Sequence, residues 1–113
     1  MLTVDALREY GANVDEGLNR CMNNEAFYLR LVKMAAEDKG FGKLADALNG
    51  NDLDAAFDAA HGLKGVLGNL ALTPIYAPTS ELTELLRAKQ DGDYSAFLAQ
   101  ITEQRDKLLA LCR

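Results

Sequence analysis

The sequence has no tryptophan, one histidine, two cysteines and two prolines among its 113 residues. Cys21 and Cys112 have no metal-ligand spacing with each other or with the histidine, so we do not expect a zinc site. We expect both cysteines to be reduced thiols, because a disulfide between them would need an oxidising compartment and closely spaced Cα atoms.

Long apolar runs and clusters of positive charge are also missing. No apolar run approaches the roughly 20 residues of a membrane-spanning helix, and no charged-then-apolar signal segment opens the chain. We therefore expect a cytoplasmic protein with no membrane partner. The net charge is −5 and no cluster of Lys and Arg is present, which argues against a nucleic-acid partner. A nucleotide loop of the form GxxxxGK(S/T) is absent too, so chemistry with ATP is not expected of this chain.

What is present is typical of one globular domain over residues 1–113. Hydrophobic residues make up 49% and charged residues 26% of the sequence, ordinary values for a soluble globular protein. A chain of this length can bury about two thirds of its unfolded surface, which is enough for a stable core.

Apolar residues recur with the period of a helix, and nothing alternates with the period of a strand over a useful length. We therefore expect an all-α protein. Helices are expected over 4–10, 13–21, from Asn24 to a break at 38–40, then over 41–49, 53–70, from 74 to about Gln90 with Pro78 inside it, and after Asp91-Gly92-Asp93. The expected caps are Thr3, Gly11, Asn24, Gly50, Asp52, Thr73 and the segment 91–93.

The connections between the long helices are short, which favours antiparallel neighbours. The predicted architecture is an antiparallel up-down four-helix bundle with extra short N-terminal helices. We expect four tyrosines at the rim of the bundle: Tyr10, Tyr28, Tyr76 and Tyr94.

The single histidine, His61, lies in the helix expected over 53–70. At about 100° per residue, it falls nearly opposite the apolar side of that helix, so we expect it to face water. Asp54, Asp58, Lys64, Gly65, Gly68 and Asn69 are expected to face outward as well. The side expected to be buried consists of Ala55, Ala56, Ala59, Leu63, Val66, Leu67 and Leu70.

Residues three, four and seven positions after His61 share its face of the helix, and they are Lys64, Gly65 and Gly68. A glycine inside a helix costs about 1 kcal/mol relative to alanine. We interpret the glycines as a bare patch that leaves room for a large partner. Lys64 could neutralise an anion on the imidazole, and Phe57 could be an apolar contact point for that partner.

The segment His61-Gly62-Leu63-Lys64-Gly65, preceded by Ala59-Ala60 and followed by Gly68-Asn69-Leu70, resembles the phosphorylated helix of histidine-containing phosphotransfer (HPt) domains. The resemblance is most specific over about residues 41–113 and implies the same helical bundle. The sequence departs from the family at two positions, since a small residue is common where Leu67 stands and a glycine where Ala71 stands. These departures could change how the end of the helix packs.

The resemblance implies that His61 is the phosphoacceptor through Nε2, that Lys64 is its charge partner and that Gly65 leaves space for the partner protein. Together with Gly65, the docking residues are expected to be Gly68, Phe57 and Asn69. The implied partners are response-regulator receiver domains and a hybrid sensor histidine kinase. The chain would be a phosphoryl carrier rather than an enzyme, and the Mg²⁺ used in phosphoryl transfer would belong to the receiver. A monomer is expected, because one face must serve two partners.

Other interpretations of the same residues remain open. The protein could be a docking module that binds receiver domains without phosphorylation, in which case His61→Gln would leave its activity intact. It could be a small hydrolase or lyase with His61 as general base, although no second catalytic group is evident. Asp58 could orient the imidazole. Gly65 and Gly68 could instead permit close packing of another helix, and Phe57 could lie at the edge of the core.

Overall fold

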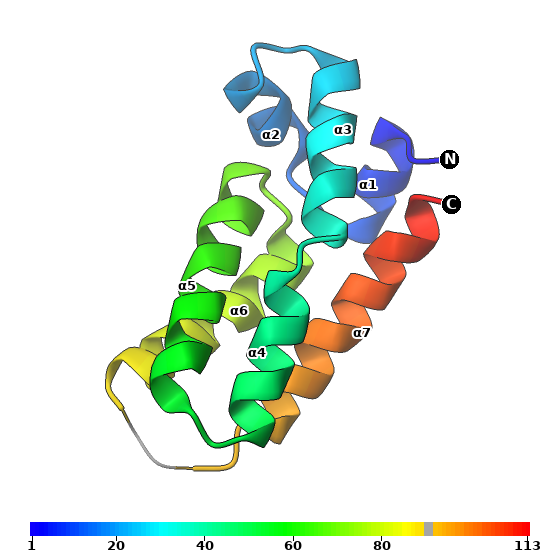
Figure 1. Cartoon of the computed structure of the whole chain (residues 1–113). Coiled ribbons are helices and arrows are strands. Elements are labelled where there is room, and N and C mark those ends of the chain that lie inside the picture. Colours follow the sequence, from blue (N-terminus) through cyan, green and yellow to red (C-terminus); the bar gives the residue numbers. More distant parts are fainter. Residues whose placement is uncertain (90–91) are drawn as a thin grey trace.

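The computed structural model describes residues 1–89 and 92–113. Within these residues it contains seven α-helices and no strand (Figure 1), so the prediction of an all-α protein is confirmed. The expected end of one helix near Gln90 and the expected cap at Asp91 concern residues outside that description. The helices are α1 (Val4–Tyr10), α2 (Val14–Arg20), α3 (Glu25–Ala36), α4 (Gly40–Asn49), α5 (Leu53–Asn69), α6 (Thr73–Arg87) and α7 (Ser95–Leu111).

Side-chain caps fix where four of these helices begin. The side-chain oxygens of Thr3, Asn13, Asn24 and Asp52 accept hydrogen bonds of 3.1 to 3.3 Å from backbone N–H groups three residues further on. Such bonds satisfy amides that have no partner inside the helix. Gly11 ends α1 with φ 110°, a left-handed conformation that favours glycine. The predicted caps at Thr3, Gly11, Asn24 and Asp52 are therefore confirmed.

Other predicted helix ends were displaced by a residue or two. Thr73 is the first residue of α6 rather than its cap, and Leu72 holds the cap position without a side-chain hydrogen bond. Tyr94 holds the cap position of α7, while the Asp93 carboxylate accepts a hydrogen bond of 2.9 Å from the Ser95 amide.

The turns after α4 and α5 each contain a left-handed residue other than glycine. Gly50 is the residue at the end of α4, as predicted, but its φ is −86° and the positive φ falls on Asn51, at 56°. Ala71, which follows α5, also has a φ of 56°. Because this region favours glycine, the glycine common in HPt domains at the position of Ala71 would suit this turn.

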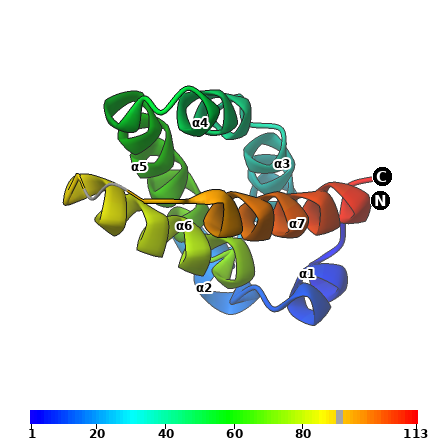
Figure 2. The ribbon, with the colours of Figure 1, turned by 90° about the horizontal axis from the view of Figure 1, so that it is seen from below.

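Helices α4 to α7 form a bundle in which successive helices run in opposite directions (Figure 1). Seen from below, α5 lies between α4 and α6, and α7 completes the group (Figure 2). The shorter helices α1 and α2, together with α3, extend the bundle at one end. The two chain termini meet there, where the Met1 ammonium donates a hydrogen bond to the carbonyl of Arg113 (Figure 1).

The buried stripe of α5 consists of Ala56, Ala60, Leu63 and Leu67. These residues are four, three and four positions apart, so they form one narrow line along the helix. The prediction of a wider buried side was wrong for Ala55 and for Val66, which is 37% exposed. It also missed Ala60. The departure from the family at Leu67 is accommodated in the core, since this side chain is fully buried.

Tyr28 was wrongly expected at the rim of the bundle. It is fully buried, and its hydroxyl donates a hydrogen bond of 2.9 Å to the carbonyl of Leu70. Gly17 allows this, because a Cβ on Gly17 would lie only 2.5 Å from Cε1 of the Tyr28 ring. Burial raises the pKa of the Tyr28 hydroxyl to about 12. The ring therefore ties α2 and α3 to the end of α5.

Candidate functional site

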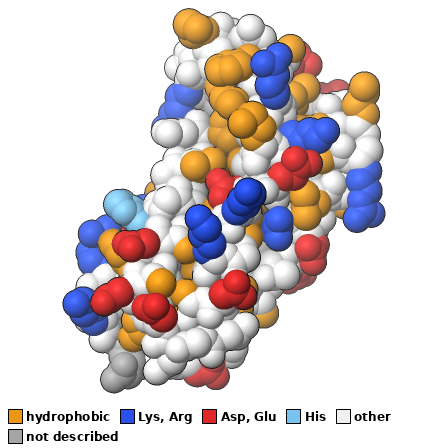
Figure 3. Space-filling model, in the orientation of Figure 1, with side chains coloured by type: hydrophobic (Ala, Val, Ile, Leu, Met, Phe, Trp, Pro, Cys, Tyr) orange, Lys and Arg blue, Asp and Glu red, His pale blue; other side chains and the backbone are white. Residues whose placement is uncertain are grey.

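His61 lies in the middle of α5, on the side opposite the buried stripe, and the prediction that it faces outward is confirmed. Its side chain is exposed, and the pale-blue histidine stands out on the surface in Figure 3. A Cβ built on Gly62 or Gly65 would meet no heavy atom within 4 Å. A large molecule can therefore approach the imidazole over these two glycines.

The sequence predicted that Gly68 belongs to this open patch, but the structure shows that it does not. A Cβ on Gly68 would lie 2.8 Å from Cε1 of Tyr76, a residue of α6. The glycine thus permits close packing of α5 against α6, which was the alternative interpretation of its role. This packing leaves His61 exposed, because Tyr76 covers α5 two turns beyond the histidine. Asn69, the next residue, faces outward as expected.

Phe57 lies one turn before His61, and the two rings are stacked, with centroids 5.4 Å apart and planes inclined by 23°. On α6, the guanidinium carbon of Arg87 is 5.0 Å from the centroid of the Phe57 ring, a cation–π contact. The Phe57 side chain is half-buried. It therefore supports the imidazole from one side and is less free to contact a partner than the sequence suggested.

Lys64 lies one turn after His61 and points toward α6. Its ammonium Nζ is 3.0 Å from Oε1 of Glu84, and its side chain is 26% exposed. The other carboxylate oxygen of Glu84 accepts a hydrogen bond of 3.2 Å from Nε of Arg87. The bonds from Lys64 and Arg87 hold the pKa of the Glu84 carboxyl below its usual range.

These contacts connect five residues of α5 and α6, which we call the His61 cluster: Phe57, His61, Lys64, Glu84 and Arg87. The cluster holds two cations and one anion beside an exposed imidazole. Sequence reasoning found the three members on α5 and missed Glu84 and Arg87. The available signal was their spacing of three on the exposed side of α6, which is typical of an ion pair within a helix.

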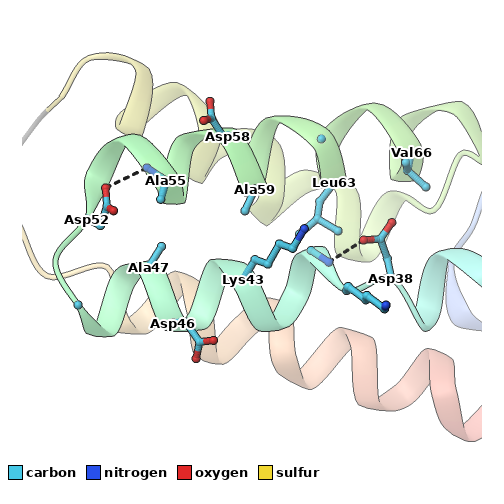
Figure 4. Close-up of a pocket in the computed structure, with 14 residues that line it drawn as sticks. Asp38, Lys43, Asp46, Ala47, Asp52, Ala55, Asp58, Ala59, Leu63 and Val66 are labelled. Carbon is cyan, nitrogen blue, oxygen red and sulfur yellow. Dashed lines mark hydrogen bonds between the residues drawn. The ribbon is translucent and has the colours of Figure 1, made fainter.

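Asp58 was considered as a group that could orient the imidazole. Within the described part of the chain it makes no hydrogen bond or ion pair with His61. The carboxylate of Asp58 points away from α4 in Figure 4. One turn earlier, the carboxylate oxygen Oδ1 of Asp54 lies 3.8 Å from Nζ of Lys89. The geometry therefore gives Asp58 no orienting role.

On the other side of His61, an open groove of about 910 Å³ runs between α4 and α5. Figure 4 shows Ala55, Ala59 and Leu63 pointing from α5 toward α4, and Lys43 reaching from α4 toward α5. Gly62, the neighbour of His61, lines the groove, whereas the imidazole does not. The groove gives His61 no enclosed pocket of the kind that a hydrolase or lyase would use.

The remaining chemical expectations concern metals, thiols and membranes. Among residues 1–89 and 92–113, no three His, Cys, Asp or Glu side chains are grouped so that they could hold a metal ion. Cys21 and Cys112 are both free thiols, as expected. Within the same ranges, none of the helices has the length and apolar character needed to cross a membrane.

The fold and the site define a helical bundle that presents one histidine on the exposed face of a central helix. The family model for the Hpt domain matches residues 30–111. The chain therefore belongs to the Hpt domain family, whose members act in histidine phosphotransfer within two-component phosphorelays. Searches of curated proteins and of solved structures found no significant match.

Proposed function

We propose that this protein carries a phosphoryl group on His61 and exchanges it with the aspartate of response-regulator receiver domains. The observation that carries the proposal is the environment of His61: its imidazole is exposed, the adjacent Gly62 and Gly65 leave open space, and Lys64 lies one turn away. Membership of the Hpt domain family supports the same conclusion.

In the proposed step, the lone pair of His61 Nε2 attacks the phosphorus of a receiver aspartyl phosphate. An N–P bond forms as the P–O bond breaks, and the electron pair of that bond stays on the aspartate carboxylate. The ring, which is now positively charged, releases its Nδ1 proton to water and regains a proton from water when the phosphoryl group is passed on. Transfer to a second receiver reverses these changes, with its aspartate as the nucleophile. Neutral imidazole suits this chemistry, because its unprotonated ring nitrogen has a lone pair that can attack phosphorus.

The His61 cluster supplies charge for the proposed phosphorylated state. Phosphorylation places between one and two negative charges beside Lys64. Arg87 adds a second cation on α6 and is held near the site by Phe57 and Glu84. Catalysis of phosphoryl transfer rests mainly on positioning and charge stabilisation. We propose that the Mg²⁺ and the acidic pocket for this reaction belong to the receiver, and that a hybrid sensor histidine kinase is the upstream partner.

The proposed docking surface runs over Gly65 and Asn69 and includes the exposed side chain of Val66. Val66 lines both the α4–α5 groove and a second hollow formed with Met34 of α3. Phe57 and Gly68 would contribute indirectly, by supporting the imidazole and by setting the distance between α5 and α6. We further propose that the carrier works as a monomer, because one face must serve two partners in turn. We propose the cytoplasm as its compartment.

The test is transfer of label from phosphorylated receiver domains of the same cell to the wild-type protein and to His61→Gln. Label on the wild type alone, labile in acid and stable in alkali, would support the carrier. Label on His61→Gln would refute His61 as the acceptor. Receivers that bind the protein without transferring label would favour a docking module that binds receivers without phosphorylation.

A further inference from the structure

We propose that Glu84 is a positioning residue. It forms an ion pair with Lys64 in the unphosphorylated protein and releases Lys64 to the phosphoryl group on His61. This inference rests on the proposed function of His61. It gives the ion pair between α5 and α6 a role in setting how stable the phosphorylated state is.

The geometry gives Lys64 two competing partners. Its ammonium is 3.0 Å from the Glu84 carboxylate on α6, yet Lys64 follows His61 by three residues, so both side chains leave the same face of α5. A lysine on a flexible four-carbon stem can swing between nearby anions. A phosphoryl group on His61 would therefore have to take Lys64 from Glu84.

Arg87 makes the exchange feasible. It donates a hydrogen bond of 3.2 Å to the second oxygen of Glu84. When Lys64 leaves, the Glu84 carboxylate keeps this cationic partner and also remains in contact with water, since its side chain is 53% exposed. The ion pair between Lys64 and Glu84 therefore lowers the attraction of Lys64 for the phosphoryl group. Its breaking leaves no charge unpaired, because Glu84 keeps Arg87. A phosphoryl group held less tightly is easier to pass on.

Removing the Glu84 carboxylate should stabilise phosphorylated His61. Exposed ion pairs contribute little, so we expect Glu84→Gln to raise the equilibrium constant for phosphorylation about threefold. The effect should depend on Lys64. In a Lys64→Gln background, Glu84→Gln should change the constant by much less, because only the direct repulsion between carboxylate and phosphoryl group is relieved.

The experiment measures phosphoryl exchange with phosphoramidate in excess ammonia, followed by phosphorus NMR. In this reaction the N–P bond of phosphoramidate breaks, an N–P bond to His61 forms, and ammonia leaves with the proton of the ring. Equilibrium constants are compared for wild type, Glu84→Gln, Lys64→Gln and the double variant. Glu103→Gln is the matched control, because it removes a carboxylate paired with Lys107 on α7 at 3.7 Å.

A rise confined to Glu84→Gln, and lost in the Lys64→Gln background, would support the inference. Equal constants for wild type and Glu84→Gln would overturn it and leave the proposed function standing. Equal rises with and without Lys64 would overturn it too, because the carboxylate would then act by repulsion alone. Failure of wild-type His61 to accept any phosphoryl group would overturn the proposed function, and this inference with it.

Discussion

Replacing Gly65 by alanine is expected to make the protein more stable. A glycine inside a helix costs about 1 kcal/mol relative to alanine, and a Cβ on Gly65 meets no heavy atom within 4 Å. No steric cost opposes the gain, so Gly65→Ala should raise the free energy of unfolding by about 1 kcal/mol. For a chain of this length the corresponding rise in Tm is about 4 °C.

Gly17→Ala is the matched comparison and should have the opposite effect. Its Cβ would lie 2.5 Å from a ring atom of Tyr28, which is fully buried and tied to Leu70 by a hydrogen bond. The ring cannot move aside without breaking that bond. Overpacking of this kind costs about 1–3 kcal/mol, which outweighs the gain in helix propensity.

The assay is urea unfolding followed by far-ultraviolet circular dichroism. The expected order of stability is Gly65→Ala, then wild type, then Gly17→Ala. A Gly65→Ala protein less stable than wild type would refute the reasoning, because it would mean that the surface over Gly65 is occupied. The same variant should also accept label from a receiver more slowly than wild type, despite its greater stability, if the partner docks over this glycine.

Three further outcomes follow from the fold. Tyr28→Phe leaves the buried Leu70 carbonyl without its hydrogen-bond donor. The free energy of unfolding, measured by urea unfolding, should fall by about 1–2 kcal/mol. The pKa of Tyr28 is about 12 in the folded protein and about 10 when unfolded, so its contribution is complete below pH 10 and is lost as the pH rises toward 12. Equal alkaline losses of stability in wild type and Tyr28→Phe would contradict this. Thiol titration of unreduced protein in denaturant should count both Cys21 and Cys112, and a count below two would show a disulfide.

The sequence was sufficient to predict several features that depend on local spacing. The caps at Thr3, Asn24 and Asp52 were found because a capping side chain bonds to an amide three residues away. The outward direction of His61 was found because an amphipathic helix defines its own buried side. These features need no knowledge of how one helix lies against another.

What the sequence could not provide is the register between helices. Glu84 and Arg87 join the His61 cluster only because α6 packs on α5 at one particular height. Gly65 and Gly68 share a helical face and looked equivalent, yet Tyr76 covers one and leaves the other open. Tyr28 was wrongly expected at the rim, because the carbonyl that accepts its hydrogen bond is 42 residues away in the chain.

The glycines of this protein are explained by different requirements. Gly17 and Gly68 are required by the fold, since a methyl group at either position would collide with a tyrosine ring. Gly62 and Gly65 have no such reason, because alanine would fit at both positions and would stabilise α5 by about 1 kcal/mol each. The contacts of the folded chain therefore do not account for the two glycines beside His61. The proposed function would account for them, because a receiver that brings its aspartate to the imidazole would gain room wherever α5 has no side chain.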